Sequence, residues 1–107
     1  MNPRRRELPQ RRHSETFDMS FDGFSKKYYV TVGYYDDGGI GEVFINHPAS
    51  GFQSEAIARD GAVLLSLALQ YGVPLETLQH AITRNDNNEP TSIVGAVVDR
   101  LVRMEKA

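Results

Sequence analysis

The feature that most constrains the fold of this chain is a period-two alternation of side chains between residues 26 and 35. In an extended backbone, one side of this segment would carry Tyr28, Val30, Val32 and Tyr34. The other side would carry Tyr29, Thr31, Gly33 and Tyr35. Aromatic and β-branched residues in this pattern favour a β-strand.

Two further strands are expected beside this one. Residues 17–21 alternate polar side chains with Phe17, Met19 and Phe21, and residues 40–46 form a third apolar stretch. Both linkers contain turn formers, because Asp22-Gly23 suits a tight hairpin and residues 36–39 read Asp-Asp-Gly-Gly. The economical arrangement is an antiparallel meander of three strands, which needs a cover on its apolar face.

The rest of the chain has helical patterns. After a turn-forming break at residues 47–51, Ser54 is expected to cap a helix that runs to Tyr71, before Gly72 and Pro74 end it. Apolar residues cover most of the circumference of this helix, which is typical of a largely buried helix.

Two shorter helices are expected after it. The first spans residues 74–83, a polar loop follows at residues 84–90, and Thr91 or Ser92 opens the last helix. Its inward residues would be Val94, Val97, Val98, Leu101 and Val102. The predicted fold class is therefore α+β, a three-stranded antiparallel meander packed on about three C-terminal helices.

Length and composition indicate one globular domain without a thiol chemistry. A chain of 107 residues is too short for two catalytic lobes around a cleft. The chain contains no cysteine, which excludes disulfides, thiolate nucleophiles and zinc–thiolate sites. It has neither a run of eighteen apolar residues nor an apolar segment after its basic start, so we expect a cytoplasmic protein without a membrane span.

The net charge of −2 conceals an uneven distribution. Residues 1–13 contain five arginines and one glutamate, whereas residues 14–107 contain seven basic and thirteen acidic side chains. We expect residues 1–13 to be a disordered arm, because it has little to bury, and residues 14–107 to be the single folded domain. The arm would bind an anionic partner, or else fold back on the acidic body as a solvated tail. Its arginines are Arg4, Arg5, Arg6, Arg11 and Arg12.

No grouping of residues typical of catalysis or of metal binding is found. The three histidines, at positions 13, 47 and 80, lack the spacing that brings two imidazoles to one metal. Glu42 and Asp60 are the only acids adjacent to expected core segments, and a surface ion pair is the commoner role for such groups. We therefore expect no catalytic, cofactor-binding or metal-binding residue.

One spacing is typical of DNA-binding proteins. Residues 68–78 place a small residue, Gly72 and an apolar residue at the positions used by a helix-turn-helix. The second helix, however, contains Glu76 and no Lys or Arg before Arg84, and an ordinary helical hairpin explains the same spacing. A nucleic-acid-binding or transcription-linked protein that uses this hairpin and the basic arm is the alternative function.

Aromatic side chains on the expected sheet point to a protein partner. If the valines of the meander face the helices, then Tyr29, Tyr35 or Phe44 lies on the far side. An uncovered aromatic face of this kind implies association, either with a second copy or with another protein. The other possibility is that these tyrosines only direct their hydroxyl groups to water.

Four blocks of sequence resemble the TSCPD domain, which occurs at the C-terminus of adenosylcobalamin-dependent (class II) ribonucleotide reductases and in small free-standing proteins. They read Leu-Pro-Gln-Arg-Arg at 8–12, Gly-Glu-Val-Phe-Ile at 41–45, Leu-Ala-Leu-Gln-Tyr-Gly-Val-Pro-Leu-Glu at 67–76 and Thr-Ser-Ile-Val at 91–94. The resemblance covers residues 8–104. It implies a small accessory domain related to deoxyribonucleotide synthesis, with a reductase subunit as one partner.

The chain departs from the pattern for which the family is named. Where that name implies Thr-Ser-Cys-Pro-Asp, this chain has Thr91-Ser92-Ile93-Val94-Gly95, so no thiol is present at this site. The resemblance implies that adenosylcobalamin belongs to the full-length reductases, and this chain is expected to bind no cofactor. Our hypothesis is a non-catalytic interaction or regulatory module.

Overall fold

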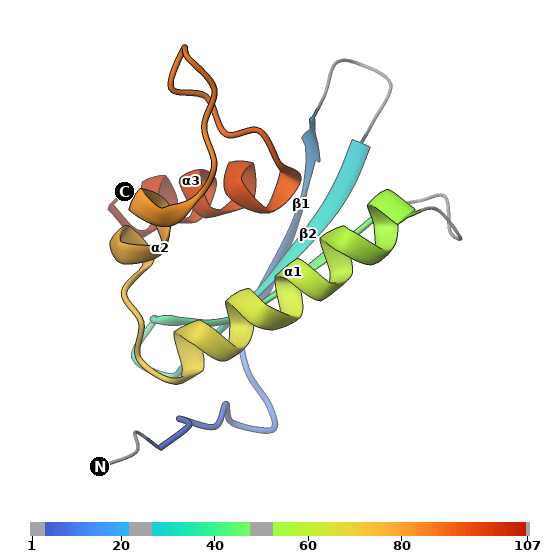
Figure 1. Ribbon diagram of the computed structural model, residues 1–107. Coiled ribbons are helices and arrows are strands. Elements are labelled where there is room, and N and C mark those ends of the chain that lie inside the picture. Colours follow the sequence, from blue (N-terminus) through green and yellow to red (C-terminus); the bar gives the residue numbers. More distant parts are fainter. Residues whose placement is uncertain (1–3, 22–26, 48–52, 107) are drawn as a thin grey trace. The chain divides into compact units, whose positions relative to one another are not determined.

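The computed structural model describes residues 4–21, 27–47 and 53–106. Along the chain the elements are β1 (Ser14–Ser20), β2 (Lys27–Tyr34), β3 (Ile40–Asn46), α1 (Gln53–Gln70), α2 (Leu75–Ala81) and α3 (Ile93–Lys106) (Figure 1). A three-stranded antiparallel sheet followed by three helices confirms the α+β prediction. The chain forms two compact units, residues 1–72 with the sheet and α1, and residues 73–107 with α2 and α3.

The sheet has the strand order β1-β2-β3, as expected for a meander. One face is buried and carries Tyr28, Val30, Val32, Val43 and Ile45. Phe17 of β1 lies opposite Val30, so the first strand continues this apolar face. The alternation in the sequence therefore places the core of the sheet correctly.

The turn between β2 and β3 follows the prediction from Asp-Asp-Gly-Gly. The amide of Gly38 donates to the carbonyl of Tyr35 at 2.9 Å, and Gly38 has a φ of 89°. Only glycine adopts that angle without strain. The other expected turns, Asp22-Gly23 and the break after His47, lie outside the described residues.

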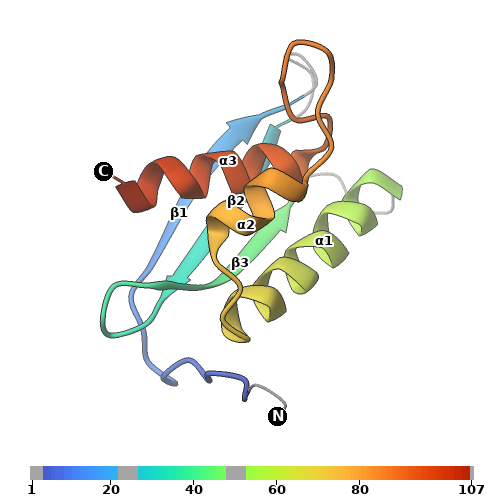
Figure 2. The same cartoon turned by 60° about the vertical axis from the view of Figure 1, so that its left-hand side comes forward.

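Helix α1 runs along the free edge of β3 (Figure 2). Ser66 Oγ accepts a hydrogen bond from the amide of Val43 at 2.9 Å and donates one to the carbonyl of the same residue at 3.0 Å. One helical turn further on, Gln70 Nε2 donates to the carbonyl of Gly41 at 2.9 Å. Two side chains of the helix thus take the place of a fourth strand.

The geometry of the two elements explains this match. Four residues of a helix rise about 6 Å, and two residues of a strand rise about 6.8 Å. Ser66 can therefore face Val43, and Gln70 can face Gly41. Earlier in the same row of the helix, Ala58 and Ala62 are buried and small enough for the backbones to approach closely.

The second unit is a pair of helices joined by a loop. Its buried side chains are Leu75 on α2 and, on α3, Ile93, Val97, Val98, Leu101 and Val102. Ser92 caps α3, since its Oγ accepts a hydrogen bond from the amide of Gly95 at 3.0 Å. The predicted start of the last helix is confirmed.

None of the helices in the described parts of the chain is long and apolar enough to cross a membrane.

Ser66→Ala tests the closure of the sheet edge. The substitution removes a hydrogen-bond partner from both backbone groups of Val43, which costs about 1–3 kcal/mol for a group left unsatisfied. Alanine regains about 0.5 kcal/mol as the better helix former. We expect a net loss of about 1 kcal/mol in the free energy of unfolding, measured by urea denaturation. We also expect faster hydrogen exchange at the Val43 amide, and Ser20→Ala at the exposed end of β1 as a silent control. An unchanged exchange rate at Val43 would contradict the assignment.

Candidate interaction surface

The face of the sheet opposite the buried valines carries two exposed aromatic side chains. Tyr29 on β2 is 42% exposed and Phe44 on β3 is 49% exposed. Phe44 lies opposite Thr31, whose hydroxyl is 2.9 Å from that of Thr16 on β1. Large aromatic surfaces beside small polar side chains are typical of a contact surface. Tyr29 and Phe44 are thus exposed, as expected, and their binding of a partner stays a prediction.

Tyr35 differs from the expectation of an exposed aromatic residue. Its side chain is only 6% exposed, and its hydroxyl donates to the carbonyl of Arg6 at 2.7 Å. The guanidinium of Arg6 lies 3.8 Å from the centre of the ring, a cation–π contact. The sequence pattern missed this because the strand ends at Tyr34, so the alternation of faces does not extend to Tyr35.

The arm contacts the body of the first unit through three of its five arginines. Arg5 Nε donates to Gln70 Oε1 at 2.5 Å, Arg6 forms an ion pair with Asp37 at 2.9 Å, and Arg12 forms one with Glu42 at 2.5 Å. The amide of Arg6 also donates to the carbonyl of Gln70. Residues 4–13 therefore show the folded-back arrangement that the charge distribution allowed.

The other two arginines of the arm have no such anchor. Arg4 and Arg11 are exposed, and within the described part of the chain no acidic side chain pairs with either of them. Binding of an anionic partner by the whole arm stays a prediction. Arg4 and Arg11 are the arginines that such a partner would meet first.

A groove of about 340 Å³ lies between α1 and β3. Phe44 is on its strand side, and Val63 and Leu67 are on its helix side. Val63 is 56% exposed, so the groove opens an apolar strip to solvent beside the exposed aromatic face. We call this groove, together with Tyr29, the docking groove.

Positive charge borders the docking groove. Arg5 and Arg59 line it, and Glu42, the acid among its lining residues, is already neutralised by Arg12. Arg59 lies 3.7 Å from Glu55 and is 64% exposed, so its guanidinium keeps most of its hydrogen-bonding capacity. An apolar strip bordered by arginines suits a partner segment that combines apolar and acidic side chains.

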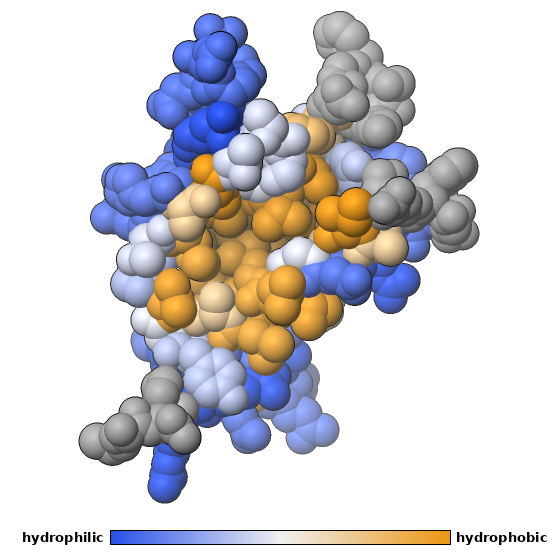
Figure 3. All heavy atoms as spheres, in the orientation of Figure 1, coloured by the Kyte–Doolittle hydropathy of each residue, from blue (hydrophilic) through white to orange (hydrophobic). Residues whose placement is uncertain are grey.

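Further apolar side chains are exposed along α1. Figure 3 shows hydrophobic residues gathered over this helix in the middle of the face drawn. Ile57 and Leu64 are exposed, and neither belongs to the lining of the docking groove. The apolar pattern of α1 predicts a mostly buried helix, and these exposed residues show that the prediction is wrong for part of its surface.

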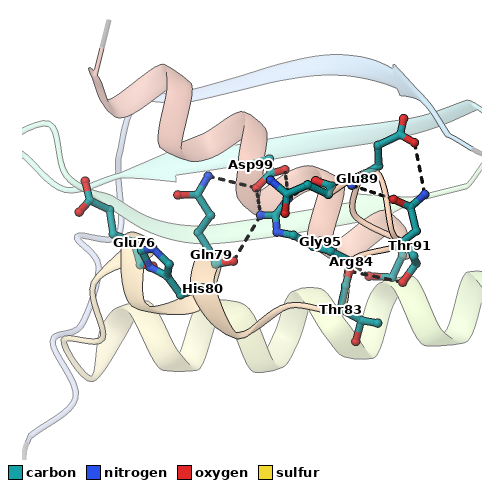
Figure 4. Close-up of polar contacts among 12 residues, drawn as sticks. Glu76, Gln79, His80, Thr83, Arg84, Glu89, Thr91, Gly95 and Asp99 are labelled. Carbon is teal, nitrogen blue, oxygen red and sulfur yellow. Dashed lines mark hydrogen bonds and ion pairs between the residues drawn. The ribbon is translucent and has the colours of Figure 1, made fainter.

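A polar cluster holds the second unit together. The guanidinium of Arg84 contacts both carboxylate oxygens of Asp99, at 2.7 and 3.0 Å, and Gln79 Nε2 donates to the same carboxylate at 3.1 Å (Figure 4). Arg84 also donates to the carbonyls of Gln79 and Asn88. One side chain thus ties α2, α3 and the loop of residues 84–90 to each other, and its hydrogen bonds lower the pKa of Asp99.

The loop between α2 and α3 is ordered by its own side chains. Asn85 Oδ1 accepts hydrogen bonds from the amides of Asn87 and Glu89, and Asn88 has a φ of 63°. The side chain of Asn85 therefore fixes the backbone of this loop.

The acids and histidines that the sequence singles out lie apart from one another in the described residues. No cluster of three histidine, aspartate or glutamate side chains that could hold a metal ion occurs among them. Glu42 is paired with Arg12, and Asp60 is exposed. His80 lies in the last turn of α2, with its Nδ1 2.7 Å from the carbonyl of Glu76. The helix-turn-helix alternative stays a prediction, and α2 itself contains no Lys or Arg.

The helical periodicity of α1 does not reveal which of its residues build this surface. It predicts helix at Ser66, Gln70, Val63 and Arg59, and no contact with β3 or with a partner. A signal was present, because Ala58, Ala62, Ser66 and Gln70 recur every four residues. Small residues followed by hydrogen-bonding ones in one helical row indicate close approach to another backbone.

Comparison with known proteins identifies what the chain is similar to. The model of the TSCPD domain matches residues 1–105. Relatives named vitamin B12-dependent ribonucleotide reductase include those of Rhodopirellula baltica, 35% identical over 94% of this chain, and Agrobacterium fabrum, 40% identical over 74%. The protein of the same name from Streptomyces coelicolor is 34% identical over 98% of the chain. No solved structure shows significant similarity.

The chain spans only a small part of each of these relatives. The matched regions are 10% of the Rhodopirellula protein, 6% of the Agrobacterium protein and 10% of the Streptomyces protein. The similarity thus concerns one region of much longer proteins.

Asp99→Asn tests the polar cluster of the second unit. Loss of charge-assisted hydrogen bonds should lower the free energy of unfolding by about 1–2 kcal/mol at pH 7. Because folding lowers the pKa of Asp99, its contribution is present above the unfolded value, near pH 4, and is lost as the pH falls through the folded value. The gap between wild type and variant should therefore close in acid, as followed by urea denaturation at several pH values. Asp86→Asn in the exposed loop is the control, and a gap that persists in acid would contradict the role of the charge.

Proposed function

The chain belongs to the TSCPD domain family, and on that premise we propose that it is a non-catalytic interaction module that docks on a vitamin B12-dependent ribonucleotide reductase. It would regulate or assist deoxyribonucleotide synthesis through contact, without forming or breaking bonds of substrate itself. The observation that carries the proposal is the match of nearly the whole chain to a small region of these reductases.

The exposed apolar surface supports docking. A domain that is related to one region of a long chain is expected to keep surfaces that suit the remainder of that chain. In this structure the docking groove offers Phe44 and Val63 to solvent, with Tyr29 beside them. Aromatic and aliphatic anchors in a groove are the residues that usually carry the affinity of an interface.

The charges specify what the partner segment should contain. Arg5 and Arg59 border the groove, and the acid that lines it is neutralised within the chain. A segment of the reductase with an apolar side chain for the groove and a carboxylate for Arg59 would be complementary. Such charge pairing contributes to specificity and to the rate of association more than to affinity.

We assign adenosylcobalamin to the reductase and not to this chain. The docking groove, at about 340 Å³, is near the lower limit of pockets that hold drug-sized ligands, and a corrinoid is larger than those. The groove therefore does not fit the cofactor. The reaction itself is left to the partner, since this chain has no cysteine.

Phe44→Ala tests the docking groove. We expect binding of the purified B12-dependent reductase of the source organism to weaken at least about tenfold, because truncation of a central aromatic anchor costs about 1.4 kcal/mol or more. Isothermal titration calorimetry measures the effect. Leu64→Ala is the matched control, since Leu64 is an exposed apolar residue outside the groove.

Three outcomes would contradict the proposal. The first is that the wild-type chain does not bind the reductase, and the second is that Phe44→Ala and Leu64→Ala bind equally well. The third is binding of duplex DNA that weakens steeply with salt and requires residues 1–13, which would favour the nucleic-acid alternative. Thermal melting of both variants should match wild type, because both side chains are exposed.

A further inference from the structure

The two edges of the sheet differ in whether side chains of the first unit bind their backbone groups. At β3, Ser66 and Gln70 occupy the free backbone groups of the edge. At β1, no described residue does the same. A strand edge with free amides and carbonyls is a template for pairing with another strand.

The register of the sheet shows which groups of β1 are available. The amide of Tyr34 donates to the carbonyl of His13 at 3.0 Å, so this pair is hydrogen-bonded toward β2. Hydrogen-bonded and non-bonded pairs alternate in an antiparallel ladder. The backbone groups that point away from β2 therefore belong to Ser14, Thr16, Asp18 and Ser20. The same alternation correctly directs the free groups of Val43 toward Ser66.

The edge of β1 has few of the features that normally prevent pairing. Its seven residues contain no proline and no lysine, and its register with β2 is continuous. The irregularity of the sheet lies instead between β2 and β3, at Gly33 and Tyr34. The side chains of Thr16 and Asp18 are exposed on the outer face and leave the edge accessible.

We propose that β1 pairs with β1 of a second copy of this chain, antiparallel and centred on Phe17, to form a continuous six-stranded sheet. In this register Thr16 lies opposite Asp18 of the second copy, and Ser14 lies opposite Ser20. Each of these two pairs exchanges two backbone hydrogen bonds across the new ladder, and its two-fold equivalent exchanges two more. The interface is isologous, as in most dimers.

The side chains of β1 are complementary to themselves in this register. Glu15 lies opposite Met19 of the second copy and Asp18 lies opposite Thr16, so neither acid of the strand lies directly opposite a like charge. The two copies of Phe17, each half-buried in its own chain, meet on the apolar face at the two-fold axis. A register centred on Asp18 would instead place two carboxylates opposite each other, which is destabilising.

Solution mass tests the association itself. A single strand pair buries less surface than a standard interface, so we expect weak dimerisation, visible as the chain concentration approaches about 1 mM. Sedimentation equilibrium should then show an average mass that rises from the 12.0 kDa of one chain toward twice that value as the concentration increases. A mass of one chain throughout this range would overturn the proposal.

A pair of substitutions at Thr16 tests the strand and its register. Thr16→Asp places a carboxylate opposite Asp18 of the second copy at two equivalent positions, and we expect the dimer to dissociate at least tenfold more readily. Thr16→Lys places an ammonium group at the same positions and should preserve or strengthen the dimer. Both variants lose the hydrogen bond between Thr16 and Thr31, so they are matched in that loss. They differ by two units of net charge, so both are measured at high salt, where repulsion between distant charges is screened.

The order of the two dissociation constants decides the outcome. Equal constants, or a stronger dimer with Thr16→Asp, would overturn the register centred on Phe17. Circular dichroism of each variant at low concentration establishes that the monomer is folded. The inference is independent of the docking on a reductase proposed above, because it rests on β1 and is read out with this chain alone.

Discussion

The hydrogen bonds between α1 and the edge of β3 are the interaction on which the first unit depends. A meander of three strands has two free edges, and a helix usually covers a sheet by its face. Here Ser66 and Gln70 bind the backbone of Val43 and Gly41 directly. This fixes the rotation of α1 about its axis, because only one row of the helix can face the strand. The same rotation places Val63 and Leu67 next to Phe44 and so creates the docking groove.

Gln70 connects this edge to the basic arm. Its side-chain amide donates to Gly41, its side-chain oxygen accepts from Arg5, and its backbone carbonyl accepts from the amide of Arg6. The side chain is buried, and its donor and acceptor groups are both used, as a buried amide requires. The arm therefore follows the C-terminal end of α1 and the turn at Asp37, where Arg6 stacks on Tyr35. The ion pairs of the arm and its hydrogen bonds to Gln70 together explain the path of the arm along the first unit.

The sequence predicted the elements well and the surface less well, and the reason is physical. Period-two and helical patterns report which face of an element is apolar, so the strands, the cap at Ser92 and the turn at Gly38 could be predicted from local chemistry. The environment of Tyr35 and the pairing of Arg84 with Asp99 depend on residues distant in sequence, which no periodicity records. The exposure of Val63 likewise depends on the rotation of α1 about its axis. Ser66 and Gln70 set this rotation through their hydrogen bonds to β3.

The free edge of β1 and the docking groove lie at opposite ends of the strand order, so their occupation is compatible. In the six-stranded sheet that we infer, β3 of each copy would be outermost, with its α1 beyond it. The two β3 strands would be about 24 Å apart, five strand spacings of about 4.8 Å. A two-fold axis perpendicular to the sheet keeps both outer faces on the same side. Both docking grooves would then open on the same side of the sheet, turned away from each other by its twist. A partner with two matching segments would bind the second groove at a raised effective concentration once the first is occupied.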